Sequence, residues 1–136
     1  MQFESKNELD LKTMSSLALA FLGDGVYEMF VREYLITKGN STVKRLHQNC
    51  VKWVCCEFQA KVSNEVLMDI FTEEEKDVYL RGRNAKVGHI PKNANIANYH
   101  AATAFESVFG YLYLKSDMQR LKFLFLKITE FMLEQE

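Results

Sequence analysis

A carboxylate in the middle of an apolar segment is the first candidate for chemistry in this sequence. Asp24 lies between Gly23 and Gly25, within residues 17–36, which are otherwise mainly apolar. Apolar residues recur there at three- and four-residue spacing, which predicts a helix. Each glycine costs about 1 kcal/mol relative to alanine inside a helix. We therefore expect a close approach at Asp24, either by another backbone or by a ligand.

A second apolar segment, residues 99–114, repeats this arrangement. Its lone carboxylate is Glu106, and Gly110 follows one helical turn later on the same face. If the glycines of the two helices face each other, the helices cross closely and Asp24 and Glu106 converge. Carboxylate oxygens on rigid elements suit a hard divalent cation such as magnesium. We predict that this pair holds such an ion.

The composition predicts a single all-α domain. The chain has 136 residues, 48% of them hydrophobic, which is enough for one core without disulfides or metals. It contains one proline and six glycines, and no alternating apolar–polar run is bounded by turn residues. We therefore expect a helical bundle over residues 1–136, with residues 1–14 as a loose polar lead-in.

Capping residues and turn signals predict the helix boundaries. The sequence Lys38-Gly39-Asn40 ends the Asp24 helix near Thr37, and Thr72 followed by three glutamates is typical of a helix start. Residues 87–98 contain Gly, Pro and Asn, and we expect a loop there. The further helices that we expect are 43–62, 64–71, 73–85, 98–114 and 118–133.

The three cysteines do not indicate a metal site. Cys50, Cys55 and Cys56 match no common zinc spacing, and no pair of histidines follows them. We interpret them as reduced thiols on a helix. The N-terminus has no apolar core after a basic start, and no apolar run is long enough to span a bilayer. We therefore expect neither a signal peptide nor a membrane partner.

Three motifs, taken in order, resemble those of the ribonuclease III family. Residues 19–28, Leu-Ala-Phe-Leu-Gly-Asp-Gly-Val-Tyr-Glu, resemble its signature helix, and residues 81–86 and 104–106 resemble its later blocks. The separate motifs are moderately specific, but their order and spacing together are a strong signal. The resemblance runs from about Leu17 to Leu114. Since no further domain follows, it is greatest to the small members that lack a double-stranded-RNA-binding domain.

The resemblance implies a ribonuclease III endonuclease domain that hydrolyses phosphodiester bonds of double-stranded RNA with Mg²⁺. It implies that Asp24 and Glu106 are metal ligands and catalytic residues, because they stand where the family has metal-binding carboxylates. It further implies a homodimer in a bacterial-type cytoplasm that matures the precursor of large-subunit (23S) ribosomal RNA. A ribosomal protein that presents the substrate is a further expected partner.

Two positions depart from the longer members of the family. Those members have an acidic residue one turn before the signature aspartate, where this chain has Ala20, and an aspartate three residues before the second glutamate, where it has Thr103. The departures leave the number of metal ions open. They also keep open a catalytically inactive RNA-binding module of the same fold. A purely structural helical dimer is a third alternative, but it does not explain the paired carboxylates and glycines.

Basic residues are unevenly distributed, although the net charge is only −1. Residues 78–105 contain no Asp or Glu, and we expect this stretch and the start of the 43–62 helix to contact RNA phosphates. The residues concerned are Arg81, Arg83, Asn84, Lys86, Lys92, Lys44 and Arg45. Such contacts recognise backbone and shape, since the major groove of duplex RNA is too deep and narrow for side chains.

Two further residues lie near the candidate site in the sequence. Glu28 is one turn after Asp24, and it is either a neighbour of the metal ligands or the partner of Arg32 in an i,i+4 ion pair. His100 is interpreted as structural, because metal-assisted hydrolysis requires no protein base. The two apolar helices also carry more apolar surface than one small domain easily covers, and it includes Phe21, Phe30, Phe105, Phe109 and Tyr113. The family resemblance implies that some of this surface is a symmetric dimer interface.

Overall fold

The fold is helical throughout the part of the chain that is described. The computed structural model describes residues 8–136, with side chains from Leu11 onward, and contains no strand in this range. The predicted all-α class is therefore confirmed. The elements are α1 (Glu8–Thr13), α2 (Ser16–Thr37), α3 (Val43–Val54), α4 (Cys56–Val62), the π-helical segment η1 (Ser63–Leu67), α5 (Met68–Ile70), α6 (Glu73–Arg83), α7 (Ile96–Leu114) and α8 (Met118–Glu134).

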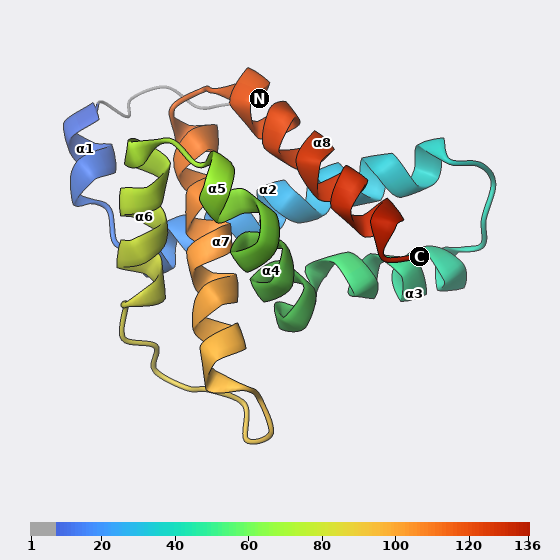
Figure 1. The fold of residues 1–136 in the computed structure, drawn as a ribbon, viewed down its shortest axis with the longest axis horizontal. Helices are drawn as coiled ribbons and strands as arrows, with labels where there is room; N and C mark the ends of the chain where they lie inside the picture. Colours follow the sequence, from blue (N-terminus) through green and yellow to red (C-terminus); the bar gives the residue numbers. More distant parts are fainter. Residues whose placement is uncertain (1–7) are drawn as a thin grey trace.

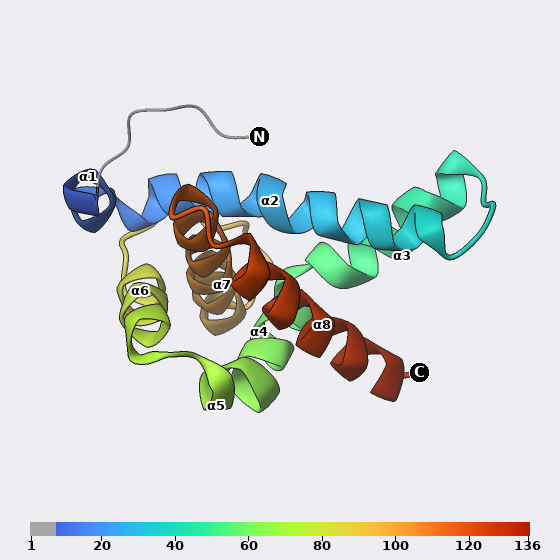
Figure 2. The same cartoon turned by 90° about the horizontal axis from the view of Figure 1, so that it is seen from above.

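Two long helices, α2 and α7, cross each other, and the other helices pack around them (Figure 1). Figure 2 shows α2 along the long axis on one side of the molecule, with α7 between α6 and α4. The Tyr27 ring of α2 meets the Phe105 ring of α7 edge-on, with 4.7 Å between centroids, and the Phe109 ring at 5.3 Å. Because all three side chains are fully buried, these contacts hold the two helices at their crossing.

The predicted helix over residues 43–62 is wrong in its middle, because the chain breaks at Cys55. Thr42 caps α3, and its hydroxyl accepts a hydrogen bond from the Arg45 N–H at 3.2 Å. Cys55 then adopts an extended conformation, with φ −70° and ψ 151°, and α4 begins at the next residue. The break allows α3 to pack against α2 while α4 packs against α7. No glycine or proline marks this break in the sequence.

Two other predicted boundaries also need correction. Residues 8–13, expected in a loose lead-in, form α1, and Leu11 is buried in the core; residues 1–7 lie outside the described range. The helix expected at 64–71 is not separate, because η1 and α5 continue α4 without a gap. The other predicted helices agree with α2, α6, α7 and α8, apart from small shifts at their ends.

Polar contacts and a glycine fix α6 against its neighbours. Thr72 and Glu75 form a capping box, with hydrogen bonds of 3.1 Å and 2.9 Å between each side chain and the other residue's N–H. The buried Glu75 carboxylate also accepts two hydrogen bonds from Arg120 of α8, at 2.7 and 2.9 Å. At Gly82 an added Cβ would lie 2.6 Å from the Ser107 hydroxyl of α7. Both α7 and α8 are therefore tied to α6.

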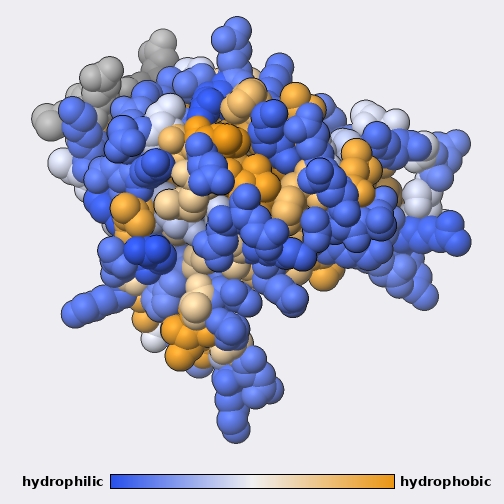
Figure 3. All heavy atoms as spheres, in the orientation of Figure 1, coloured by the Kyte–Doolittle hydropathy of each residue, from blue (hydrophilic) through white to orange (hydrophobic). Residues whose placement is uncertain are grey.

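The surface combines hydrophilic regions with exposed apolar patches. Figure 3 shows apolar side chains in the middle of one face, with hydrophilic side chains around them. Within residues 8–136, none of the helices has the length and apolar character needed to cross a membrane. The exposed apolar residues include Phe21 and Met29 of α2.

Candidate active site

α2 and α7 approach each other backbone to backbone at two glycines. A Cβ added to Gly23 would collide with the carbonyl oxygen of Glu106, and one added to Gly110 would collide with that of Leu19. Only glycine allows this approach without a shift of a helix. The prediction that these two glycines face each other is therefore confirmed. Gly25 is different, because apart from its chain neighbours and the backbone of its own helix no described atom lies within 4 Å of the position of its Cβ.

The crossing places the Asp24 and Glu106 side chains beside each other. Asp24 is exposed to solvent, whereas Glu106 is half-buried. Burial and, next in size, the negative charge of Asp24 raise the pKa of Glu106 from its ordinary value of 4.5 to about 8. Two acids that share a site behave in this way, because ionising the second one places two negative charges close together and raises the free energy. The arrangement is therefore one whose negative charge a bound cation would stabilise.

Three residues beside Glu106 were not predicted from the sequence: Gln59, Cys56 and Tyr27. The Gln59 amide lowers the pKa of Glu106, against the larger effects of burial and Asp24. Burial raises the pKa values of Cys56 and Tyr27, and the charge of Glu106 raises both further. The Tyr27 hydroxyl donates a hydrogen bond of 2.8 Å to the carbonyl oxygen of Trp53, which ties α2 to the end of α3. None of the three had a clear sequence signal, since Gln59 stands between Glu57 and Lys61 and looks like one more polar residue of a surface helix.

The two departures from the longer family members lie in the core beside the site. Ala20 is 6% exposed and has no polar side-chain atom. Thr103 is 8% exposed, and its hydroxyl donates to the carbonyl oxygen of Tyr99 at 3.1 Å, within its own helix. Among the described residues, no group of three or more His, Cys, Asp and Glu is placed to hold a metal ion. The acidic donors at the crossing are therefore Asp24 and Glu106.

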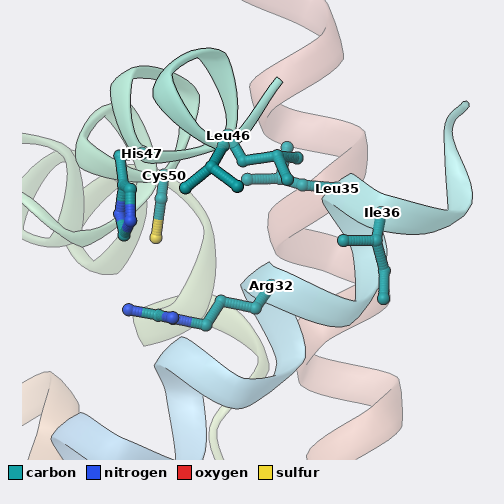
Figure 4. A pocket seen from close by; sticks show the side chains of 7 residues that line it. Arg32, Leu35, Ile36, Leu46, His47 and Cys50 are labelled. Carbon is teal, nitrogen blue, oxygen red and sulfur yellow. The ribbon is translucent and has the colours of Figure 1, made fainter. Parts of the chain in front are cut away.

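Glu28, one turn beyond Asp24, forms an ion pair with Arg32. Its side chain lies 2.6 Å from the guanidinium of Arg32, which agrees with the i,i+4 interpretation. Arg32 also faces a hollow between α2 and α3, into which the Cys50 thiol points (Figure 4). Burial raises the pKa of this thiol, so it stays protonated and unreactive. The hollow is lined by Arg32, Leu35, Ile36, Val43, Leu46, His47 and Cys50.

The residues predicted to contact RNA fall into two groups, and all of them are exposed. The loop group lies at the end of α6 and in the loop that leads to α7, and consists of Arg81, Arg83, Asn84, Lys86 and Lys92. The α3 group lies at the start of α3, and consists of Lys44 and Arg45. Figure 1 shows the start of α3 at one end of the long axis, whereas the loop group follows the chain from the end of α6 to the start of α7, so the two groups do not form one continuous patch.

Arg81 of the loop group is engaged in an ion pair with Asp77, at 3.3 Å. Asn84 is the residue at which α6 ends. His100, near the start of α7, has a buried Nδ1 without a hydrogen-bond partner among the described residues. Lys86 and Lys92 are the two lysines of the loop group, and both lie in the loop between α6 and α7 with exposed side chains.

The apolar surface expected at a dimer interface is present only in part. Phe21 is 86% exposed and Met29, on the same helix, is 69% exposed. Phe105 and Phe109 are completely buried in the protein's own core, so the prediction that they belong to the uncovered apolar surface is wrong. They are buried because α7 is enclosed by α2, α4 and α6. Beside α2 lies an apolar hollow lined by Leu22, Gly25, Val26, Met29, Phe30, Glu33, Tyr113, Met118 and Lys122.

Comparison with known proteins agrees with this architecture. Residues 17–117 match the Ribonuclease III domain family. The X-ray crystal structure of a Fusobacterium nucleatum protein superposes with a TM-score of 0.78 and 27% sequence identity, covering 93% of this chain and 98% of that one.

Curated relatives named Mini-ribonuclease 3 are similar over most of their length. The Symbiobacterium thermophilum protein is 46% identical, over 80% of this chain and 83% of its own. The Enterococcus faecalis protein is 40% identical over 83% and 86%, and the Staphylococcus aureus protein 36% identical over 92% and 94%. The chain therefore belongs to the ribonuclease III family, in its Mini-ribonuclease 3 group, and is an endoribonuclease that acts on double-stranded RNA.

Proposed function

We propose that this enzyme hydrolyses double-stranded RNA with a Mg²⁺ ion held by Asp24 and Glu106. The observation that carries the proposal is the convergence of these carboxylates where α2 and α7 cross, beside the contact between Gly23 and Gly110. Both carboxylates stand on long helices and not on loops, which favours a rigidly held ligand pair. Their positions also correspond to the metal-binding carboxylates that the sequence motifs imply.

The chemistry of the donors fits magnesium. A hard cation prefers carboxylate oxygens. Burial and then the charge of Asp24 raise the pKa of Glu106, and a divalent ion would oppose both effects by stabilising the ionised carboxylate. The nearby Cys56 is a soft donor, but burial raises its pKa and keeps it a protonated thiol. When bound, magnesium lowers the pKa of water and stabilises charge on phosphate. Two protein carboxylates suffice in this proposal, because magnesium retains several waters.

RNA binding is assigned mainly to the loop group. Its cations are exposed, and the loop leads directly into α7, the helix that carries Glu106. Contacts to phosphates from this loop would hold the duplex backbone over the carboxylates without reading the bases. The α3 group lies at one end of the long axis, away from the loop group. It would therefore contact a more distant part of the same duplex, or the duplex bound by a second copy of the chain.

The proposed assembly is a symmetric homodimer with one active site per subunit. Phe21 is an almost fully exposed aromatic residue, and the apolar hollow lies on the same helix. A large exposed apolar patch of this kind is typical of a protein–protein interface. A twofold axis would place two copies of the carboxylate pair on one duplex, so that each subunit cuts one strand.

The proposed biological substrate is the precursor of large-subunit (23S) ribosomal RNA, in a bacterial cytoplasm. The resemblance to the small members of the family supports this substrate. The net charge of −1 also implies weak binding to plain duplexes, because the 17 Lys and Arg residues are offset by 18 Asp and Glu residues that phosphates repel. A ribosomal protein that presents the folded RNA would then supply the missing affinity.

The test of this function is cleavage of duplex RNA in Mg²⁺ by carboxylate variants. Asp24→Asn and Glu106→Gln each remove one charged ligand and keep the shape of the side chain. We expect near-complete loss of cleavage, with the helical content and duplex binding retained. Glu28→Gln is the matched control, because its carboxylate is paired with Arg32, and it should cleave at close to the wild-type rate. Wild-type cleavage by either ligand variant would contradict the metal site.

A further inference from the structure

Gln59 of α4 carries an amide that the fold itself does not use. The residue is only 1% exposed, and neither its Oε1 nor its Nε2 has a hydrogen-bond partner among the described residues. A buried polar group without a partner is unfavourable, and in native proteins it calls for an explanation. An apolar side chain of the same length would fill this place at lower cost. The amide is therefore retained for something other than packing.

The surroundings of Gln59 show what its amide faces. α4 packs against α7, and Gln59 lies one turn after Cys56, whose thiol feels the charge of Glu106. The Gln59 amide is close enough to the Glu106 carboxyl to lower its pKa, although no hydrogen bond of good geometry joins the two side chains. Asp24 acts on the same carboxyl from α2. Glu106 thus has a neutral polar neighbour on α4 and a charged one on α2.

We propose that Gln59 is a positioning residue, whose Nε2 donates a hydrogen bond to the Glu106 carboxylate when that carboxylate binds the metal ion. The inference rests on the metal site of the proposed function. The buried Gln59 amide has no hydrogen-bond partner among the described residues, and α4 packs against α7, the helix that carries Glu106. A donor on α4 would hold one oxygen of the ligand carboxylate, so that the other faces the ion.

One substitution, Gln59→Met, distinguishes the positioning role of Gln59 from a purely space-filling role. Gln59→Met has nearly the same length and flexibility but no amide. If Gln59 only fills space, the variant keeps its metal affinity. If Gln59 positions Glu106, the metal-free variant stays folded and is at least as heat-stable as the wild type, because an unpaired buried amide has been removed. Its affinity for the metal should nevertheless fall by about 10-fold or more, as is typical when a partner of a ligand is lost.

The experiment measures Mn²⁺ binding to RNA-free protein by electron paramagnetic resonance, together with thermal unfolding in a chelator. Thr129→Val is the control, because it removes a buried hydroxyl that donates to Leu126 within α8. It should bind Mn²⁺ like the wild type. Gln59→Asn keeps an amide but withdraws it by one carbon, and we expect it to weaken Mn²⁺ binding as well. This second variant keeps the test decisive if the methionine variant does not fold.

Two results would distinguish the possible failures. Wild-type Mn²⁺ affinity in the folded Gln59 variants, with weakened binding in Glu106→Gln, would overturn the positioning role and leave the metal site intact. Wild-type affinity in Glu106→Gln itself would overturn the metal site, and with it the proposal for Gln59. The expected result is a loss of affinity in both Gln59 variants and a larger loss in Glu106→Gln.

Discussion

The protonation of Glu106 leads to a prediction about stability that does not involve RNA. In the folded, metal-free protein its pKa is raised from 4.5 to about 8, by burial and then by the charge of Asp24. Between these two values the folded protein holds a proton that the unfolded chain has released. Stability should therefore decrease as the pH rises through this window, because unfolding then releases a proton. The stabilisation is fully present below the unfolded pKa and is lost above the folded one.

The size of this effect follows from the shift. One proton released on unfolding changes the free energy of unfolding by about 1.4 kcal/mol per pH unit. Between about pH 5 and about pH 7.5, Glu106 should therefore lower the stability of the metal-free protein by at most about 3 kcal/mol. Glu106→Gln does not titrate, so it lacks this contribution. The variant should match the wild type near pH 5 and exceed it by up to about 3 kcal/mol near pH 7.5.

The assay is urea unfolding followed by circular dichroism, in a chelator, at a series of pH values. The difference in the free energy of unfolding between the wild type and Glu106→Gln isolates the contribution of Glu106, because the other titrating residues are common to both proteins. Asp24→Asn should narrow the window, since one cause of the shift is removed. Mg²⁺ added near neutral pH should stabilise the wild type but not Glu106→Gln. A difference that stays constant across the pH series would refute the raised pKa of Glu106, and with it the burial and the neighbouring Asp24 charge that cause it.

Three other changes test packing, assembly and RNA binding. In urea unfolding, Gly23→Ala should lower the free energy of unfolding by about 3 kcal/mol, because its Cβ collides with the backbone of α7. Gly25→Ala should not lower this free energy and should raise it by up to about 1 kcal/mol. Phe21→Asp should yield monomers in sedimentation, while Leu126→Asp on α8 should not; a wild-type monomer at micromolar concentration would contradict the interface. In an inactive background, Lys92→Ala should weaken duplex binding and reduce its salt dependence by about one contact. An unchanged salt dependence would shift RNA binding to the α3 group.

Helix ends were predictable where a local signal marks them. Thr72 and Glu75 form a capping box at the start of α6. Gly39 has a positive φ of 134° just after the end of α2, a backbone conformation that glycine adopts readily where a helix stops. The break at Cys55 has no such signal, because it results from the packing of α3 and α4 on different partners. α1 was missed because it is short and polar, with its place in the fold secured by the burial of Leu11.

The site was predictable to the extent that it depends on sequence neighbours. Gly23 beside Asp24, and Gly110 one turn from Glu106, are patterns within single helices, so the crossing could be inferred. Gln59 comes from a third helix, and its relation to the carboxylates depends on the break between α3 and α4. The burial of α7 on all sides explains the error about its phenylalanines, since an apolar helix is typical of a core as well as of an interface.

The contact between Gly23 and Gly110 also explains why a site with only two acidic donors is consistent with this fold. The close approach buries the residues on the inner side of the crossing, including Ala20 and Thr103, whereas Asp24 lies at its solvent-exposed edge. Even this one neighbouring charge helps to raise the pKa of Glu106 to about 8. A further carboxylate at either buried position would add to that repulsion in the metal-free protein. Alanine and an internally bonded threonine therefore limit the charge that the fold must carry, and in the proposed magnesium site water could complete the shell of the ion.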